Sequence, residues 1–260
     1  MTDRPTLSIL IPALAARRFR FFPLIDDLQA QARAAGDVEV LVLEDEGETP
    51  SGAKRNQLIA TSRGHYFAQV DDDDFVAPDY VETIRDACDG RVEVVSFDLL
   101  RIDVERGNMR THSFSIHNLD KVARSRGHWQ MTANHLCAWR RDVGTKVAFP
   151  PAIGYADDCF WYKPLIESGL VRTETHLNRI LYFYLYGSAA TANQAADSIK
   201  TTRQWQGGGV ECFRRGEEIF IANKPIEQSE SEAAVEVRDR FGRVVTLDRK
   251  TLTRFTVIKV

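Results

Sequence analysis

Short apolar segments alternate with helix-like segments through the first hundred residues, and this alternation restricts the possible folds more than any other feature. Strands rich in β-branched residues are expected at residues 6–12, 38–43, 65–70 and 92–99. Helices are expected between them, at residues 21–35, 51–63 and 78–88. The alternation predicts an α/β fold with right-handed crossovers and a mostly parallel central sheet. Continuous apolar strands further predict helices on both faces of that sheet.

The second half of the chain has a less regular pattern. We expect a hairpin over residues 101–114, a helix over 155–168 and a strand over 180–186. The last 26 residues alternate apolar and charged side chains, which predicts a small β-containing extension. We therefore predict a main domain over residues 1–206, with halves at 1–100 and 101–206, and a C-terminal extension over 207–260.

The composition is that of an ordinary soluble globular protein, with 43% apolar and 27% charged residues. No apolar run approaches the roughly 20 residues that span a bilayer, so no transmembrane segment is expected. The polar residues 1–5 do not resemble a secretory signal. The four cysteines show neither zinc-type nor paired spacing, which predicts the reducing cytoplasm. They are Cys88, Cys137, Cys159 and Cys212.

Four successive aspartates, Asp71 to Asp74, directly follow the third expected strand. Such a cluster persists more easily when a cation or hydrogen-bond donors offset the mutual repulsion. Ligands of open α/β sheets bind beyond the carboxyl ends of the strands, where the Glu44-Asp45 turn is also expected. Two acidic strand ends predict one shared crevice, and hard oxygen ligands favour magnesium, manganese or calcium. The alternative interpretation is a solvated acidic loop, against which the βαβ placement argues.

An ordered set of motifs extends this interpretation. It consists of Ile11-Pro12 ending a strand, Glu44-Asp45 with its acidic turn, Lys54-Arg55-Asn56 in a helix, the aspartate run, and Pro78-Asp79-Tyr80. In this order and spacing the motifs resemble the family-2 glycosyltransferases, which have the GT-A fold. Two further segments resemble the family's acidic pair and Tyr-rich strand, namely Tyr155-Ala156-Asp157-Asp158 and Leu181-Tyr182-Phe183-Tyr184, followed by the Ser/Thr turn at 187–191. The resemblance covers residues 7–191.

The resemblance implies a role for each matching residue. Nucleotide-sugar binding is implied for Pro12, Ala13, Glu44, Asp45, Arg55, Asp71 and Asp72. The Asp-x-Asp (DXD) motif implies a manganese or magnesium ion on Asp73, with Asp71 as a further ligand. Asp158 is the implied general base, with Asp157 as second choice. Two positions depart from the family pattern: Ala13 stands where threonine is frequent, and Asp157 stands where glutamate is usual.

The activity implied by the resemblance is inverting transfer of a sugar from a nucleotide-diphosphate donor to an acceptor hydroxyl. A hexosyl- or pentosyltransferase with a uridine-type donor is favoured, and the acceptors of such enzymes are glycans, lipid-linked sugars or proteins. Residues 1–100 would bind the nucleotide sugar and residues 101–206 the acceptor. A divalent cation would offset the charge developing on the departing diphosphate, and the carboxylate base would take the acceptor proton.

Other functions remain open from the sequence. The acceptor could be a hydroxymethylated base in nucleic acid, as for a phage-type DNA glycosyltransferase, because the tail is rich in arginine and lysine. The basic residues are Arg238, Arg240, Arg243, Arg249, Lys250 and Arg254, but Glu236, Asp239 and Asp248 interleave with them. A non-catalytic nucleotide-sugar-binding module is a second alternative, against which the intact acidic motifs argue. A nucleotidyltransferase would need a glycine-rich loop that residues 12–18 lack.

Some residue types with catalytic potential have ordinary structural interpretations. A partly buried structural role is favoured for His128 and His135 over metal or substrate binding. Core packing is favoured for Trp129, Trp139 and Trp161, although one of them could stack on a sugar ring.

Overall fold

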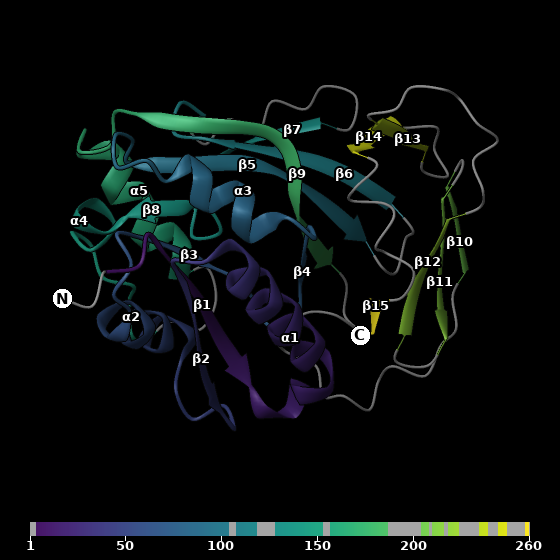
Figure 1. Cartoon of the computed structure of the whole chain (residues 1–260), viewed down its shortest axis with the longest axis horizontal. Helices are drawn as coiled ribbons and strands as arrows, with labels where there is room; N and C mark the ends of the chain where they lie inside the picture. The colour runs from purple at the N-terminus through teal and green to yellow at the C-terminus, as the bar shows by residue number, and fades with distance from the viewer. Residues whose placement is uncertain are drawn as a thin grey trace.

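The computed structural model describes residues 4–103, 108–118, 128–152 and 157–186, together with short strands in the C-terminal part. Within these ranges, strands β1 to β9 form one nine-stranded sheet (Figure 1). The strands are β1 (Leu7–Leu14), β2 (Val38–Asp45), β3 (Tyr66–Gln69), β4 (Phe75–Val76), β5 (Val94–Asp103), β6 (Asn108–Ser115), β7 (His128–Thr132), β8 (Ala138–Arg140) and β9 (Glu174–Tyr186).

The sheet runs in the order β2-β1-β3-β8-β5-β6-β7, and β9 joins both β4 and β5. The pairs β1–β2, β1–β3, β5–β9 and β6–β7 are parallel and account for most of the paired positions. Strand β8 is antiparallel to β3 and β5, and β4 is antiparallel to β9. The expected mostly parallel sheet is therefore confirmed, and β5 and β6 form the antiparallel hairpin expected near residues 101–114.

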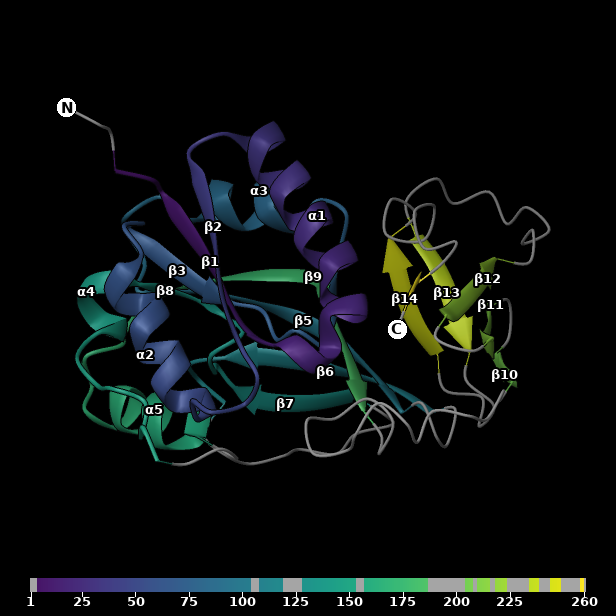
Figure 2. The same cartoon turned by 90° about the horizontal axis from the view of Figure 1, so that it is seen from below.

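Helices cover both faces of the sheet, as the apolar strands predicted (Figure 2). One face carries α1 (Arg18–Ala35) and α3 (Tyr80–Ala87), and the other carries α2 (Ser51–Thr61) and α5 (Asp157–Glu167). A 3₁₀ turn, η1 (Ala15–Arg17), joins β1 to α1, and a short helix, α4 (Arg141–Gly144), follows β8. The side chain of Gln31 ties the first pair of helices together, because it donates to the carbonyl of Ala77 (3.0 Å) and accepts from the amide of Val81 (3.1 Å).

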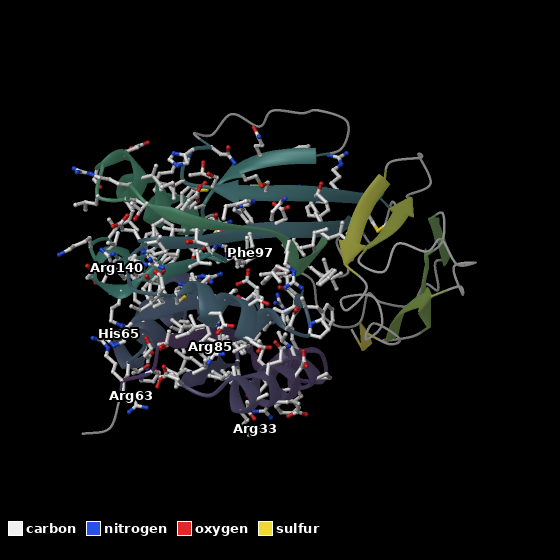
Figure 3. All side chains as sticks on the ribbon, turned by 45° about the horizontal axis from the view of Figure 1, so that its top comes forward. Arg33, Arg63, His65, Arg85, Phe97 and Arg140 are labelled. Atoms are coloured by element: carbon white, nitrogen blue, oxygen red, sulfur yellow. The ribbon has the colours of Figure 1, made fainter. Side chains whose placement is uncertain are left out.

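The core lies between the sheet and these helices. Ile9, Leu10 and Phe97 are fully buried, since the pleat places successive side chains such as Ile9 and Leu10 against helices on opposite faces. Figure 3 shows Phe97 inside the fold and Arg33 and Arg63 at its rim. The first helix ends at Gly36, whose φ of 66° is one that side chains disfavour. None of the helices in the described ranges is long and apolar enough to cross a membrane.

The C-terminal part contains further strands, both within the alternating tail over residues 235–260 and before it. They are β10 (Gln204–Gly207), β11 (Val210–Arg215), β12 (Glu218–Asn223), β13 (Ala234–Arg238), β14 (Val244–Asp248) and β15 (Ile258–Lys259). Strands β10, β11, β12 and β15 pair in that order, and β13 pairs with β14. The division into residues 1–206 and 207–260 stays a prediction.

Candidate functional site

The acidic residues that end β2 and those that follow β3 lie at one edge of the sheet. Strand β1 lies between them, and its register pairs Ala13 with Glu44 and Leu14 with Asp45. The backbone amide of Leu14 in turn donates to Oδ2 of Asp72 at 2.7 Å. The end of β1 therefore joins the Glu44-Asp45 turn to the aspartate run, as expected for adjacent parallel strands.

Helix α2 connects this edge to the second half of the chain. Nζ of Lys54 donates to the carbonyl of Ala13 at 2.7 Å and forms an ion pair with Asp45. The side chain of Asn56 donates to the carbonyl of Phe149 at 2.8 Å and accepts from the amide of the same residue at 2.9 Å. The Lys-Arg-Asn motif thus fixes the strand ends on one side and the segment before α5 on the other.

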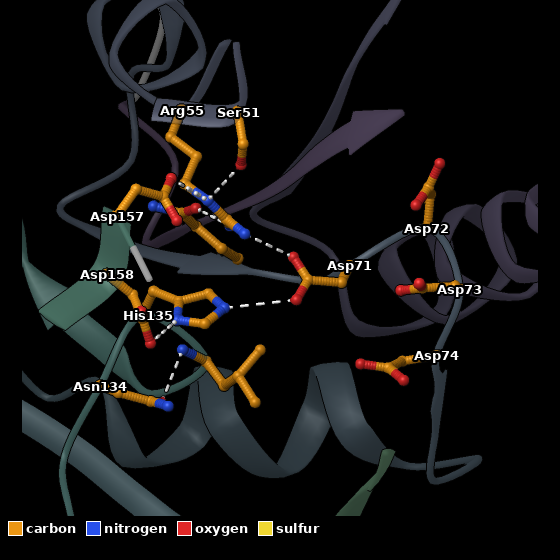
Figure 4. Close-up of polar contacts among 12 residues, drawn as sticks. Ser51, Arg55, Asp71, Asp72, Asp73, Asp74, Asn134, His135, Asp157 and Asp158 are labelled. Carbon is orange, nitrogen blue, oxygen red and sulfur yellow. Dashed lines mark hydrogen bonds and ion pairs between the residues drawn. The ribbon is translucent and has the colours of Figure 1, made fainter. Parts of the chain in front are cut away.

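Asp71 is held by two cationic side chains (Figure 4). Nη2 of Arg55 lies 2.8 Å from Oδ1 of Asp71, and Nε2 of His135 lies 3.3 Å from Oδ2. Burial alone would raise the pKa of Asp71, but Arg55 and His135 outweigh it and lower that pKa. Asp71 is therefore a stable carboxylate with both oxygens engaged.

The same two cations reach the acidic pair that begins α5. Nε of Arg55 lies 3.3 Å from Oδ2 of Asp157, and Nδ1 of His135 lies 3.1 Å from Oδ2 of Asp158. The side chain of Asp157 is 8% exposed and that of Asp158 is 20% exposed. Burial opposes ionisation of Asp158, but the hydrogen bond from His135 leads the effects that lower its pKa. Asp158 is thus the more accessible carboxylate of the pair.

His135 is a site residue that the sequence analysis assigned to structure. Its ring is 10% exposed and lies between two carboxylates. Burial and the charge of Arg55 lower the pKa of His135, but Asp71 and Asp158 outweigh them and raise it to about 9. The doubly protonated ring can donate to both carboxylates at once. His135 belongs to none of the family motifs used above, so the tertiary contacts alone reveal this position.

The other aspartates of the run have different partners. Asp72 accepts from Leu14 on one oxygen and from Arg17 on the other, and Nη1 of Arg17 also lies 3.1 Å from Oδ2 of Asp73. Burial raises the pKa of Asp73, and Arg17 lowers it. Repulsion from Asp72 and Asp71 adds to the effect of burial, and the resulting pKa is about 7. Arg17 carried no expected role in the sequence analysis.

Asp74 is fully enclosed by the sheet. It accepts from the hydroxyl of Tyr182 at 2.8 Å and from the amide of Leu185 at 2.9 Å, both in β9. Burial, together with the charges of Asp73 and Asp71, raises the pKa of Asp74 well above its usual value. The last aspartate therefore anchors the loop to β9, whereas the side chain of Asp73 is 14% exposed and contacts Arg17.

The carboxylates fit a divalent cation that takes few protein ligands. No group of three or more His, Cys, Asp or Glu side chains converges on one point in the ranges that the structure describes. Magnesium commonly uses one or two carboxylates and completes its shell with water and substrate phosphates. Asp73 suits this role because one of its oxygens pairs with Arg17 and no described cation pairs with the other, whereas both oxygens of Asp71 already have cationic partners.

The remaining predicted residues lie at the same edge with distinct surroundings. Glu44 forms an ion pair with Arg18, whose side chain is 59% exposed. Burial opposes ionisation of Asp45, but hydrogen bonds led by those from Lys54 and Thr49 lower its pKa to about 2. Beside them, Pro12 is partly buried and Ala13 is fully buried.

The tryptophans considered above lie in the described part of the chain, whereas most of the basic residues of the tail do not. Trp139 and Trp161 are fully buried and pack edge to face with centroids 5.0 Å apart, which confirms their core role. Trp129 stacks on His112 with centroids 5.4 Å apart. Arg238 lies in β13, whereas Arg240, Arg243, Arg249, Lys250 and Arg254 lie outside the described residues.

The sequence profile of glycosyl transferase family 2 matches residues 25–154, which is half of the chain. The chain belongs to this family. The match includes the Glu44-Asp45 turn, the Lys-Arg-Asn motif and the aspartate run, and it ends just before the acidic pair of α5. The family resemblance read from the motifs is thereby confirmed. A comparison with curated proteins gives no match.

Solved structures with a similar fold include TarS of S. aureus. Residues 1–349 of TarS in complex with UDP-GlcNAc align with a TM-score of 0.51 and 12% identity, over 76% of this chain and 62% of that chain. The same TarS segment in complex with UDP aligns with a TM-score of 0.47 and 14% identity, over 70% and 61% of the two chains. This family-2 member therefore has the GT-A fold, and it spans less than two thirds of the TarS chain.

Proposed function

We propose that the protein transfers a sugar from a uridine-diphosphate sugar to an acceptor hydroxyl with inversion at the anomeric carbon. One observation carries the proposal. Arg55 and His135 each join Asp71 of the aspartate run to one member of the acidic pair, Asp157 or Asp158. Donor-binding and base-bearing motifs, far apart in sequence, thus meet in one charge network. Uridine is favoured because a protein of similar fold, TarS, is recorded in complex with UDP-GlcNAc.

The residues of this network would have separate roles in binding the donor and the metal ion. Lys54 holds Asp45 at the end of β2, where a carboxylate could accept from a nucleobase N–H. Asp73 would hold a manganese or magnesium ion, which when bound offsets the charge developing on the departing diphosphate. Asp71, with both oxygens engaged by cations, would keep the run oriented toward the donor.

Asp158 is the proposed general base. Its carboxylate is ionised, more exposed than that of Asp157, and oriented by the ring of His135. It would take the proton of the acceptor hydroxyl as that oxygen attacks the sugar, a role worth about 10²–10⁴ in rate. Asp157, which is nearly buried against Arg55, would keep that guanidinium in place. The proposal also includes a hexosyl or pentosyl donor. A cytoplasmic setting is proposed from the spacing of the cysteines, which gives no disulfide or zinc pattern.

Two measurements test this proposal without knowledge of the natural acceptor. The first is a thermal-shift series with UDP, GDP, ADP and CDP, each with and without manganese, because a ligand of the folded state raises the melting temperature. UDP with manganese is expected to give the largest rise. An equal response to all four nucleotides would contradict the uridine assignment.

The second measurement follows UDP release from UDP-GlcNAc, UDP-glucose and UDP-galactose, with water as a slow acceptor. Asp158→Asn should lower the rate at least about 10²-fold and leave UDP binding unchanged. Asp157→Asn is the matched variant, and it should weaken folding or UDP binding through Arg55 instead. If Asp158→Asn releases UDP as fast as the parent protein, Asp158 is not the base. A parent protein that releases UDP no faster than the protein-free solution would instead favour the non-catalytic module.

A further inference from the structure

Arg17 lies beside two aspartates of the run. It ends η1, and its side chain is 12% exposed. Its Nη1 contacts Oδ1 of Asp72 and lies 3.1 Å from Oδ2 of Asp73. Its Nη2 is buried and has no hydrogen-bond partner in the described ranges. Nη1 therefore contacts both carboxylates, while the N–H groups of Nη2 remain available as hydrogen-bond donors.

The two carboxylates depend on Arg17 to different degrees. Asp72 also accepts from the backbone amide of Leu14, so each of its oxygens has a donor. Among the described residues, Arg17 is the one cationic side chain that forms an ion pair with Asp73. The guanidinium thus stands at the carboxylate for which we proposed a metal ion.

We propose that Arg17 is the counter-ion of Asp73 before the donor binds, and that it transfers to the donor diphosphate when the metal ion enters. This inference rests on the proposed function. A divalent cation bound to Asp73 would lie close to the guanidinium, and two cations at one carboxylate repel each other. A diphosphate offers the displaced group a new anion, and the planar arginine fork matches phosphate oxygens.

A physical consequence distinguishes this arrangement from a preformed metal site. If Arg17 and the metal ion compete for Asp73, the metal alone binds weakly, and a diphosphate strengthens metal binding by drawing Arg17 away. Linkage requires the reverse as well, so that the metal strengthens nucleotide binding by the same factor. Removing the guanidinium should therefore raise metal affinity and reduce the coupling.

The test is calorimetric titration of Mn²⁺ into the full chain, first alone and then in the presence of saturating UDP. Arg17→Gln should bind Mn²⁺ alone about tenfold or more tightly than the parent protein, the scale on which removal of one nearby charge shifts a charged equilibrium. Added UDP should strengthen Mn²⁺ binding less in this variant than in the parent. Arg18→Gln is the matched control, because Arg18 is exposed and pairs with Glu44 instead of the aspartate run, and it should bind Mn²⁺ like the parent.

An unchanged or lower Mn²⁺ affinity in Arg17→Gln would overturn the inference. If that variant does not fold, Asp72→Asn combined with Arg17→Gln removes both members of the ion pair and should also bind Mn²⁺ more tightly than the parent. Binding of UDP and Mn²⁺ to the parent with no gain in either variant would refute the role of Arg17 alone. Failure of every protein to bind UDP or Mn²⁺ would refute the proposed function too.

Discussion

The two sides of the aspartate run differ in how their charge is neutralised. Asp71 lies between Arg55 and His135, which overcome its burial and lower its pKa. Asp73, two residues later, has Arg17 as its partner and has a pKa raised to about 7. The side chain of Asp71 points toward the acidic pair of α5, while Asp72 and Asp73 lie on the far side of it (Figure 4).

This difference indicates that carboxylates of one motif have different roles, one structural and one in ligand binding. A partly buried carboxylate with two cationic partners, such as Asp71, is part of the folded framework, because removal of either partner leaves a charge that is less well compensated. A partly buried carboxylate with too little positive charge nearby, such as Asp73, is destabilising until a ligand supplies more. A carboxylate of the first kind, Asp71, is expected to organise the site, and one of the second kind, Asp73, is expected to bind the cation. Five substitutions, each judged against a second variant, test how this charge network is built.

The largest effect on stability is expected at Arg55, whose guanidinium pairs with a carboxylate from each half of the chain. Arg55→Met removes the partner of Asp71 and Asp157 and should lower the free energy of unfolding by about 3–5 kcal/mol, as for other broken buried ion pairs. Urea denaturation measures this. Arg63→Met is the control, because Arg63 is 62% exposed in its pair with Glu39, and it should change stability by about 0–1 kcal/mol. Equal losses would show that burial of the network adds nothing.

A smaller effect is expected at the bridge between Asp71 and Asp158. His135→Gln should lower the rate of UDP release about 10- to 100-fold, the usual loss when a residue that orients a site ligand is removed. Stability provides a second readout. The pKa of His135 is raised from 6.5 to about 9, so its contribution is complete below pH 6.5 and is lost as the pH rises through about 9.

The parent protein should therefore be more stable than His135→Gln at about pH 6 and lose this advantage by about pH 10. His65→Gln, which changes an exposed histidine, provides the comparison. An advantage over His135→Gln that is the same at both pH values would contradict the charged bridge.

Asp73 should behave in the opposite way to Asp71 in metal-free protein. Its pKa is raised from 3.8 to about 7, so the parent loses stability as the pH rises from about 4 to about 7 and Asp73 ionises. Asp73→Asn should remove this loss and be more stable by about 1–3 kcal/mol at pH 8 in the presence of a chelator. Asp71→Asn should be less stable than the parent under the same conditions. Destabilisation by both changes would remove the distinction between the two carboxylates.

The smallest effect is expected at the link between α2 and the segment before α5. Asn56→Ala removes two hydrogen bonds to the backbone of Phe149 and should cost about 1–2 kcal/mol. Gln57→Ala, one residue along the same helix and exposed, is the matched control and should be nearly neutral. A thermal melt of both variants measures the difference, and equal melting temperatures would show that this link is dispensable.

Local sequence patterns were enough to predict the first half of the fold. Apolar β-branched runs such as 38–43 became strands, and Gly36 ends α1 as expected, because these outcomes depend on side chains and dihedral angles within a few residues. The position of two acidic segments at strand ends also predicted that Glu44-Asp45 and Asp71 to Asp74 share one edge of the sheet. That prediction followed from parallel pairing of adjacent strands, which sequence order nearly dictates.

The tertiary structure decided which charges meet. His135 lies 64 positions from Asp71 and 23 from Asp158 in the sequence, and Arg17 lies 55 from Asp72, yet each contacts these carboxylates directly. No local pattern reports such contacts, because they depend on how β8, η1 and α5 pack around the ends of β1 and β3. Local patterns and motifs were thus sufficient for the elements of the first half, for the family and for the choice of acidic residues in the proposed site. Packing determined which of those acids are neutralised and which one remains short of positive charge.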